Sequence, residues 1–84
     1  MIHFIVNPQS GKGTGEKLWR KLQAVLDSRH VDYTVHMTVD KADTVAAARK
    51  CSGNILCAIG GDGTFHDVLN GADLARTAIG FIPN

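Results

Sequence analysis

Two glycine-rich segments carry the residues of this chain that could do chemistry. The first, NPQSGKGTGEK, spans residues 7–17, and the second, GGDGT, spans residues 60–64. Each follows an apolar run that suits a buried strand and precedes a helical pattern. At such a junction the unpaired backbone N–H groups and the dipole of the helix favour an anion. Both segments are therefore predicted to bind phosphate.

Each segment also has a simpler interpretation. GGDGT could be a strained strand-to-helix turn in which Asp62 or Thr64 caps the helix. SGKG could be a flexible loop with a solvated Lys12. The spacing fits neither a Walker A loop nor a GxGxxG fingerprint, in which a glycine would stand at the position of Glu16. Because two independent loops converge on one place, we favour phosphate binding over either simpler interpretation.

Four short runs rich in β-branched or aromatic residues are the predicted strands: Ile2–Val6, Tyr33–Met37, Ile55–Ile59 and Ala78–Ile82. The first, third and fourth runs are almost continuously apolar, which predicts strands covered on both faces, whereas the second alternates and is expected at an edge. Helical patterns between the runs predict a parallel α/β sheet with right-handed crossovers. A strand order of 2-1-3-4 would bring both glycine segments to one crevice, the topological switch point at which such sheets bind ligands.

Three helices are expected between these strands. The first is amphipathic over about four turns, with Trp19 as a core candidate and an apolar stripe of Leu18, Leu22, Val25 and Leu26. A weaker pattern over residues 42–49 predicts a second helix, capped by Asp40 or Asp43. The third pattern, from Phe65 to Ala72, starts directly after the second glycine segment.

Length and composition restrict the domain and its partners. A chain of 84 residues forms at most one small domain, too small for a large cleft between two lobes. Its formal charge of +1 does not favour nucleic acid as a partner. Cys51 and Cys57 match neither a CxxC motif nor a zinc-ligand pair, so reduced thiols and a cytoplasmic location are expected. The N-terminal apolar run is too short for a membrane span and lacks the basic region of a signal peptide.

Three motifs together resemble the catalytic domain of diacylglycerol kinases and sphingosine kinases. They are NPQSGKG near the N-terminus, GGDGTFHDVLNG about fifty residues later, and IGFIP near the end. GGDGT is shared with the related NAD kinases and phosphofructokinases, and its pairing with NPxSGKG is typical of the lipid kinases. The resemblance implies a Rossmann-like, phosphofructokinase-like lobe that binds ATP and Mg²⁺ and serves the transfer of the γ-phosphate to a lipid hydroxyl, such as that of diacylglycerol.

The resemblance also implies which residues hold the nucleotide. Thr38 matches a threonine that lines the ATP site in the family, and Asp62 matches an aspartate that is catalytic in some members. Lys12 could place a movable positive charge near the β- or γ-phosphate, and Asp62 could hold magnesium directly or through water. The expected nucleotide-binding residues are Asn7, Pro8, Ser10, Gly11, Lys12, Thr38, Gly60, Gly61, Asp62, Gly63 and Thr64.

Two departures from the family pattern affect what the chain can do. His66 and Asp67 stand where many members have Asn-Glu, which concerns the choice of lipid more than ATP binding. The family's GTxND segment, and the β-rich second domain with the lipid site, a magnesium site and the catalytic carboxylate, are not in the sequence. Residues 1–84 are therefore expected to be one N-terminal nucleotide-binding domain of a two-domain protein, inactive alone. We expect self-association through an exposed strand edge and peripheral membrane contact in the full-length protein.

Two other functions fit parts of the sequence. An NAD kinase-like phosphotransferase would share GGDGT, although it is not expected to begin with NPxSGKG. A non-catalytic nucleotide-binding or interaction module would keep the fold without transferring phosphate.

Overall fold

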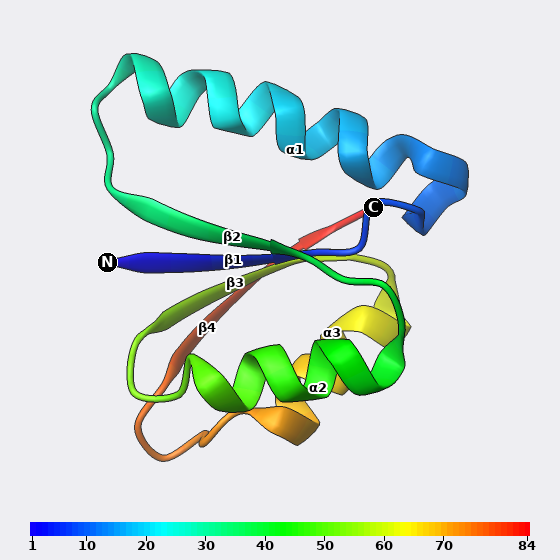
Figure 1. Cartoon of the computed structure of the whole chain (residues 1–84), viewed down its shortest axis with the longest axis vertical. Coiled ribbons are helices and arrows are strands. Elements are labelled where there is room, and N and C mark those ends of the chain that lie inside the picture. Colours follow the sequence, from blue (N-terminus) through cyan, green and yellow to red (C-terminus); the bar gives the residue numbers. More distant parts are fainter.

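The computed structural model describes all residues 1–84 as one four-stranded parallel sheet with helices on both faces (Figure 1). In chain order the elements are β1 (Ile2–Val6), α1 (Ser10–Ser28), β2 (Tyr33–Met37), α2 (Lys41–Lys50), β3 (Ile55–Gly60), α3 (Asp62–Gly71) and β4 (Ala78–Pro83). The α/β class is confirmed, and the strands lie in the order β2-β1-β3-β4, the order under which both glycine segments reach one crevice. β3 and β4 each extend one residue past the predicted runs.

The aromatic cluster under α1 forms the core on one face of the sheet. Trp19 is completely buried and packs with Phe4, Val6 and Ile59 from the two central strands. Its ring centroid lies 5.0 Å from that of Phe4 and 5.6 Å from that of Tyr33. The prediction that Trp19 belongs to the core is confirmed, and its burial fixes α1 over β1 and β3.

On the opposite face, α2 and α3 pack on the sheet side by side (Figure 1). Small residues let the two helices approach closely. Ala48 and Val68, one from each helix, are completely buried against Ile5 and Leu56 of the sheet. Gly71 faces α2, and a Cβ added there would overlap the carbonyl oxygen of Val45. The alanine-rich pattern of α2 thus serves close packing.

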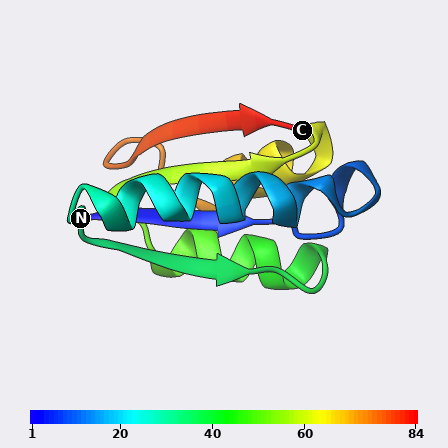
Figure 2. The same ribbon diagram turned by 90° about the horizontal axis from the view of Figure 1, so that it is seen from above.

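The expectation that β4 is covered on both faces is wrong. Figure 2 shows that α1 lies over the middle of the sheet, with β4 (red) to one side of it. On the α2–α3 face, Phe81 of β4 stacks on Phe65 with ring centroids 4.4 Å apart. On the α1 face, Ala78 and Gly80 are exposed. Ile82 still packs on the cluster under α1, but a single helix is too narrow to cover all of β4 on that face. The edge position of β4 agrees with the strand order considered from the sequence.

The helix ends answer two further questions left by the sequence. Asp40 is the N-cap of α2, and its side chain accepts a hydrogen bond from the Asp43 N–H. α3 has Gly61 at its N-cap with no side-chain cap, so neither Asp62 nor Thr64 caps it.

Val25, placed on the apolar stripe of α1, is about half exposed. None of the three helices combines the length and apolarity needed to cross a membrane.

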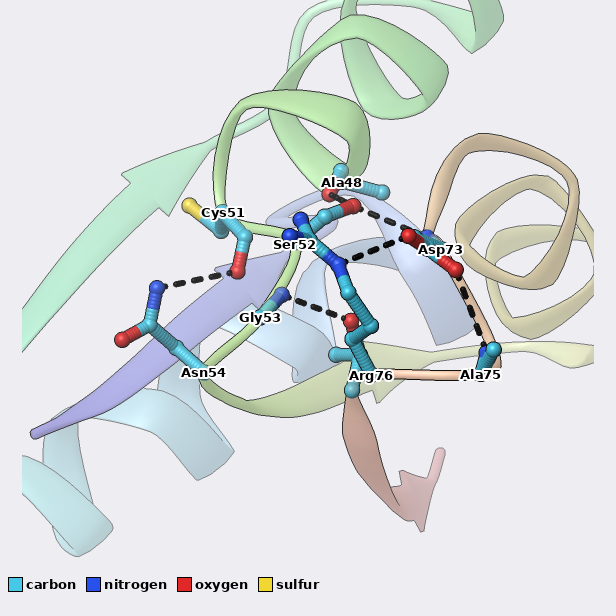
Figure 3. A network of polar contacts seen from close by, with 9 residues as sticks. Ala48, Cys51, Ser52, Gly53, Asn54, Asp73, Ala75 and Arg76 are labelled. Carbon is cyan, nitrogen blue, oxygen red and sulfur yellow. Dashed lines mark hydrogen bonds and ion pairs between the residues drawn. The ribbon is translucent and has the colours of Figure 1, made fainter.

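A polar network joins the α2–β3 and α3–β4 connections at the end of the sheet where the strands begin (Figure 3). The Asp73 N–H donates to the Ser52 hydroxyl at 2.8 Å, and the Gly53 N–H donates to the Thr77 hydroxyl at 2.9 Å. Arg76 closes the network through Asp73, with Nε 2.8 Å from the carboxylate. These contacts fix the ends of the sheet opposite to the two glycine segments.

The contact between α2 and α3 leads to a stability prediction. Gly71→Ala is expected to lower the free energy of unfolding by about 1–3 kcal/mol, because the new methyl group overlaps a backbone oxygen that cannot move alone. Gly63→Ala is the matched control, since a Cβ there meets nothing within 4 Å and alanine favours a helix by up to about 1 kcal/mol over glycine. Urea denaturation of both variants measures the difference; equal stabilities would contradict the close packing at Gly71.

Candidate functional site

The two glycine segments meet where the carboxyl ends of β1 and β3 lie side by side. From this point the chain leads into α1 on one face and into α3 on the other (Figure 1). The Asn7 N–H donates to the Ile59 carbonyl at 2.9 Å, which keeps the first segment against β3. A pocket of about 500 Å³ opens at this place. The predicted convergence of the two segments at the switch point is thus present.

The pocket includes most, but not all, of the residues expected to hold a nucleotide. Seven of them line it: Asn7, Ser10, Gly11, Thr38, Gly61, Gly63 and Thr64. Four belong to the same segments without lining it: Pro8, Lys12, Gly60 and Asp62. Six lining residues were not foreseen: Gln9, Val39, Asp40, Lys41, Thr44 and Asp67. Four of these six lie in the short connection after Thr38 and in the first turn of α2. The position of Thr38 just after a strand was the signal that could have found them.

The first segment turns through a left-handed conformation. Gly11, Lys12 and Gly13 have φ angles of +60°, +60° and +94°. A lysine in this region costs roughly 1–2 kcal/mol, which the surrounding contacts must offset. A Cβ on Gly15 would overlap the Asn7 carbonyl oxygen. The regular part of α1 therefore starts after this turn, and the backbone of Gly11 that lines the pocket lies next to the strained residue Lys12.

The second segment brings an uncapped helix start to the pocket. A Cβ on Gly60 would lie 2.6 Å from the Thr64 hydroxyl oxygen, so the glycine lets the first turn of α3 close against β3. Gly61 and Gly63 have open space where a Cβ would be. Because no side chain caps α3, the N–H groups of its first turn face the pocket region without a side-chain acceptor. This arrangement suits an anionic oxygen.

Three threonine hydroxyls form the buried floor of the pocket. Thr38, Thr44 and Thr64 are 7%, 4% and 7% exposed. The Thr38 and Thr44 hydroxyls donate to the carbonyls of Val6 and Asp40, at 3.3 and 3.0 Å. The Thr64 hydroxyl accepts from the Asn7 amide at 3.3 Å, which leaves its proton free to donate. The floor is therefore rigid and offers both donors and acceptors.

The charged residues of the pocket lie on α2 and α3. Lys41, the first residue of α2, has its ammonium group 3.9 Å from the carboxylate of Asp67. The Lys41 side chain is 75% exposed, whereas that of Asp67 is 14% exposed. Lys41 is the one cation among the lining residues, and Asp40 is already engaged as the α2 cap.

Hydrogen bonds lower the pKa of one carboxylate next to the pocket. The Val39 N–H and then the His36 side chain lower the pKa of Asp43, by hydrogen bonding to its carboxylate. Burial raises the pKa values of the Cys51 and Cys57 thiols. The two cysteines are free, as expected, and their raised pKa values keep them as neutral thiols.

The whole chain, residues 1–84, matches the family described as "Diacylglycerol kinase catalytic domain". The chain belongs to this family. Among curated proteins, it is 33% identical over 87 residues to "Putative lipid kinase YtlR" of Bacillus subtilis, covering 95% of this chain and 28% of that protein. It is 29% identical over 85 residues to "Ceramide kinase" of Arabidopsis thaliana, covering 94% of this chain and 14% of that protein. This diacylglycerol kinase-family chain therefore spans a small part of the lipid kinases that it matches.

A solved structure supports the fold independently. The structure titled "A putative diacylglycerol kinase from Bacillus anthracis str. Sterne" superposes with a TM-score of 0.77 at 24% identity, over 98% of this chain and 31% of that one. At this identity the likeness concerns the fold alone. The fold of this diacylglycerol kinase-family chain is thus that of a known structure, and the family membership rests on the sequence match over its full length.

Alanine variants of Gly11 and Gly13 separate two contributions to stability at this turn: steric overlap and backbone strain. Both have positive φ angles, so alanine at either position is strained by about 1–2 kcal/mol. A Cβ on Gly11 would also overlap the Thr14 hydroxyl, whereas one on Gly13 meets nothing within 4 Å. Gly11→Ala is therefore expected to destabilise the fold more than Gly13→Ala in urea denaturation. A larger loss for Gly13→Ala would contradict the geometry of the turn.

Proposed function

We propose that this chain is the ATP-binding lobe of a lipid kinase that transfers the γ-phosphate of ATP to a lipid hydroxyl, such as that of diacylglycerol. The observation that carries the proposal is one pocket built by both glycine segments at the switch point of a chain in this family. The names of the curated relatives include a ceramide kinase and a sphingoid long chain base kinase. Such names share a lipid hydroxyl as acceptor, and diacylglycerol is the acceptor named by the family.

The size and lining of the pocket support a nucleotide with a phosphate chain. Its volume of about 500 Å³ is in the range of small-molecule and cofactor sites. Phosphoryl transfer requires positioning and charge neutralisation more than covalent chemistry by the protein. In this proposal, backbone N–H groups near Gly61 and Gly63 hold phosphate oxygens, and the Thr64 hydroxyl donates to one of them. Lys41 supplies the positive charge, and Lys12 can approach from the rim.

The far side of the pocket suits a nucleoside. Asp67 is a largely buried carboxylate whose nearest cation is 3.9 Å away, so it retains free acceptor capacity. Ribose hydroxyls and amino groups of a base are donors that would use it. We therefore place the terminal phosphates near the glycine segments, the phosphate next to the ribose at the Lys41 ammonium group, and the nucleoside toward Asp67.

Magnesium fits this site as a partner of the nucleotide. No group of three or more His, Cys, Asp or Glu side chains is arranged to hold a metal ion by itself. Mg²⁺ is usually held by one or two carboxylates together with substrate phosphates, where it neutralises charge that develops during transfer. Asp62, exposed at the first turn of α3, is the carboxylate that we assign to it. The same residue is our candidate for a direct catalytic contribution.

In this proposal, transfer of the phosphate to a lipid requires parts of the enzyme beyond this lobe. The chain spans 28% or less of the curated lipid kinases that it matches, so the lipid site and the catalytic base are assigned to other parts of such enzymes. We expect the 84-residue chain to bind nucleotide without phosphorylating lipid. A chain that folds but binds no nucleotide would indicate a non-catalytic interaction module instead.

Magnesium ATP is expected to raise the thermal unfolding midpoint of the chain. A ligand that binds only the native state stabilises it by about 2.7 kcal/mol at one hundred times its Kd, which is roughly 10–20 °C for a domain of this size. ATP without magnesium should give a smaller rise, and Asp62→Asn should remove the magnesium-dependent part. NAD is the parallel ligand, because a shift with NAD alone would indicate an NAD kinase-like site. Cooperative unfolding with no shift for any nucleotide would overturn the proposed function.

Lys41 is expected to contribute to the affinity for phosphates. Lys41→Ala should weaken ATP binding by roughly three- to tenfold, which is modest because the side chain is largely exposed. Binding of adenosine should change little. Lys50→Ala is the matched control, because it removes the same charge from the last turn of the same helix, away from the pocket. Isothermal titration calorimetry of the three proteins measures the difference, and equal losses in the two variants would indicate a long-range charge effect only.

A further inference from the structure

Asn84 lies at the end of β4 and contacts both glycine segments. Its backbone N–H donates at 2.9 Å to the carbonyl of Gly60, the first residue of the second segment. Its side-chain Nδ2 donates to the Ser10 carbonyl at 2.9 Å and is 2.8 Å from the Ser10 hydroxyl. Its Oδ1 accepts from the Thr14 hydroxyl at 3.1 Å. One carboxamide therefore bridges the first segment to the end of β4.

The two residues that the Asn84 carboxamide holds flank the left-handed turn. Ser10 precedes Gly11, Lys12 and Gly13, and Thr14 follows them. The carboxamide thus closes across the base of a turn in which Lys12, a residue with a Cβ, holds a left-handed conformation that needs external contacts to persist. It also packs closely on the turn, because a Cβ on Gly11 would lie 2.8 Å from Nδ2.

We propose that Asn84 is a positioning residue that keeps the first glycine segment in the shape that binds phosphate. This inference rests on the proposed nucleotide function, because Ser10 and Gly11 line the pocket. Asn84 itself is not among the lining residues, so it acts through the backbone that it holds and not by touching the ligand. Through the Gly60 carbonyl, it also sets the spacing between the two segments.

The test compares phosphorylated and unphosphorylated ligands. Asn84→Ala is expected to weaken magnesium ATP and magnesium ADP by roughly tenfold, the size expected for losing a small set of hydrogen bonds that order a binding loop. Adenosine affinity should remain within about twofold, because the nucleoside lies on the other side of the pocket. Asn54→Ala is the matched control: its amide also donates to a backbone carbonyl, that of Cys51, but at the other end of the sheet. Calorimetry of the variants supplies the affinities.

A second variant tests whether Asn84 acts through its contact with Thr14 at the end of the turn. Thr14→Val keeps the shape of the side chain but removes its hydroxyl, which contacts Asn84 Oδ1 at 3.1 Å and the Gly11 carbonyl at 2.9 Å. The double variant with Asn84→Ala separates the two contacts. If both residues act through one bridge, the double variant binds ATP about as weakly as Asn84→Ala alone. In ¹⁵N-resolved NMR of the unliganded chain, the amide signals of residues 11–14 should shift in both single variants and remain unchanged in Asn54→Ala.

The possible results separate this inference from the proposed function. A wild-type chain that binds no nucleotide overturns both. A wild-type chain that binds ATP, with an Asn84→Ala variant that binds it equally well, overturns only the positioning role. An equal loss of affinity for adenosine and ATP also overturns it, since it would indicate general damage to the fold. A loss confined to phosphorylated ligands, with shifted signals at residues 11–14, supports it.

Discussion

The handedness of strand connections fixes the whole arrangement of this domain. Successive parallel strands are joined by right-handed crossovers in almost all known proteins. From β1, the chain moves to β2 on one side, whereas from β2 to β3 and from β3 to β4 it moves in the opposite direction along the sheet. A constant hand therefore requires α1 on one face and α2 and α3 on the other, as Figure 1 shows. The divergence of α1 and α3 opens the pocket between β1 and β3.

Glycines contribute to this pocket in two different ways. Gly15 and Gly60 are needed because a side chain would collide with the backbone or with the Thr64 hydroxyl beside them. They let each helix begin directly against its strand. Gly61 and Gly63 face open space, so the lack of a side chain there leaves backbone accessible from the pocket. Close packing and access to the backbone are thus supplied by neighbouring positions of one short segment.

Sequence patterns that reflect burial predicted most of the fold. They could not predict contacts between elements that are distant in the sequence. Strand limits and the burial of Trp19 follow from apolar runs and helical spacing, because both record which side of an element meets the core. The strand order entered only as the condition for bringing both glycine segments to one crevice. The exposure of Ala78 and Gly80 on β4 does not follow from its apolar composition, which does not say how far α1 extends across the sheet. Lys41 and Asp67 were missed for a similar reason: each has an ordinary place on its own helix, and only the packing of α2 beside α3 brings them to the pocket.

The charges of the pocket explain why backbone groups must carry much of any phosphate binding. One lysine and two aspartates line it, a net charge of −1, which would repel the phosphates of a nucleotide. Lys41 is also largely exposed, where water screens its charge. Attraction must then come from N–H groups and the helix dipole at the start of α3, and from a divalent cation that arrives with the nucleotide. Such groups act over short distances, so their value depends on exact placement of the loops. A site of this kind gains more from contacts that hold its backbone in shape than from additional positive side chains.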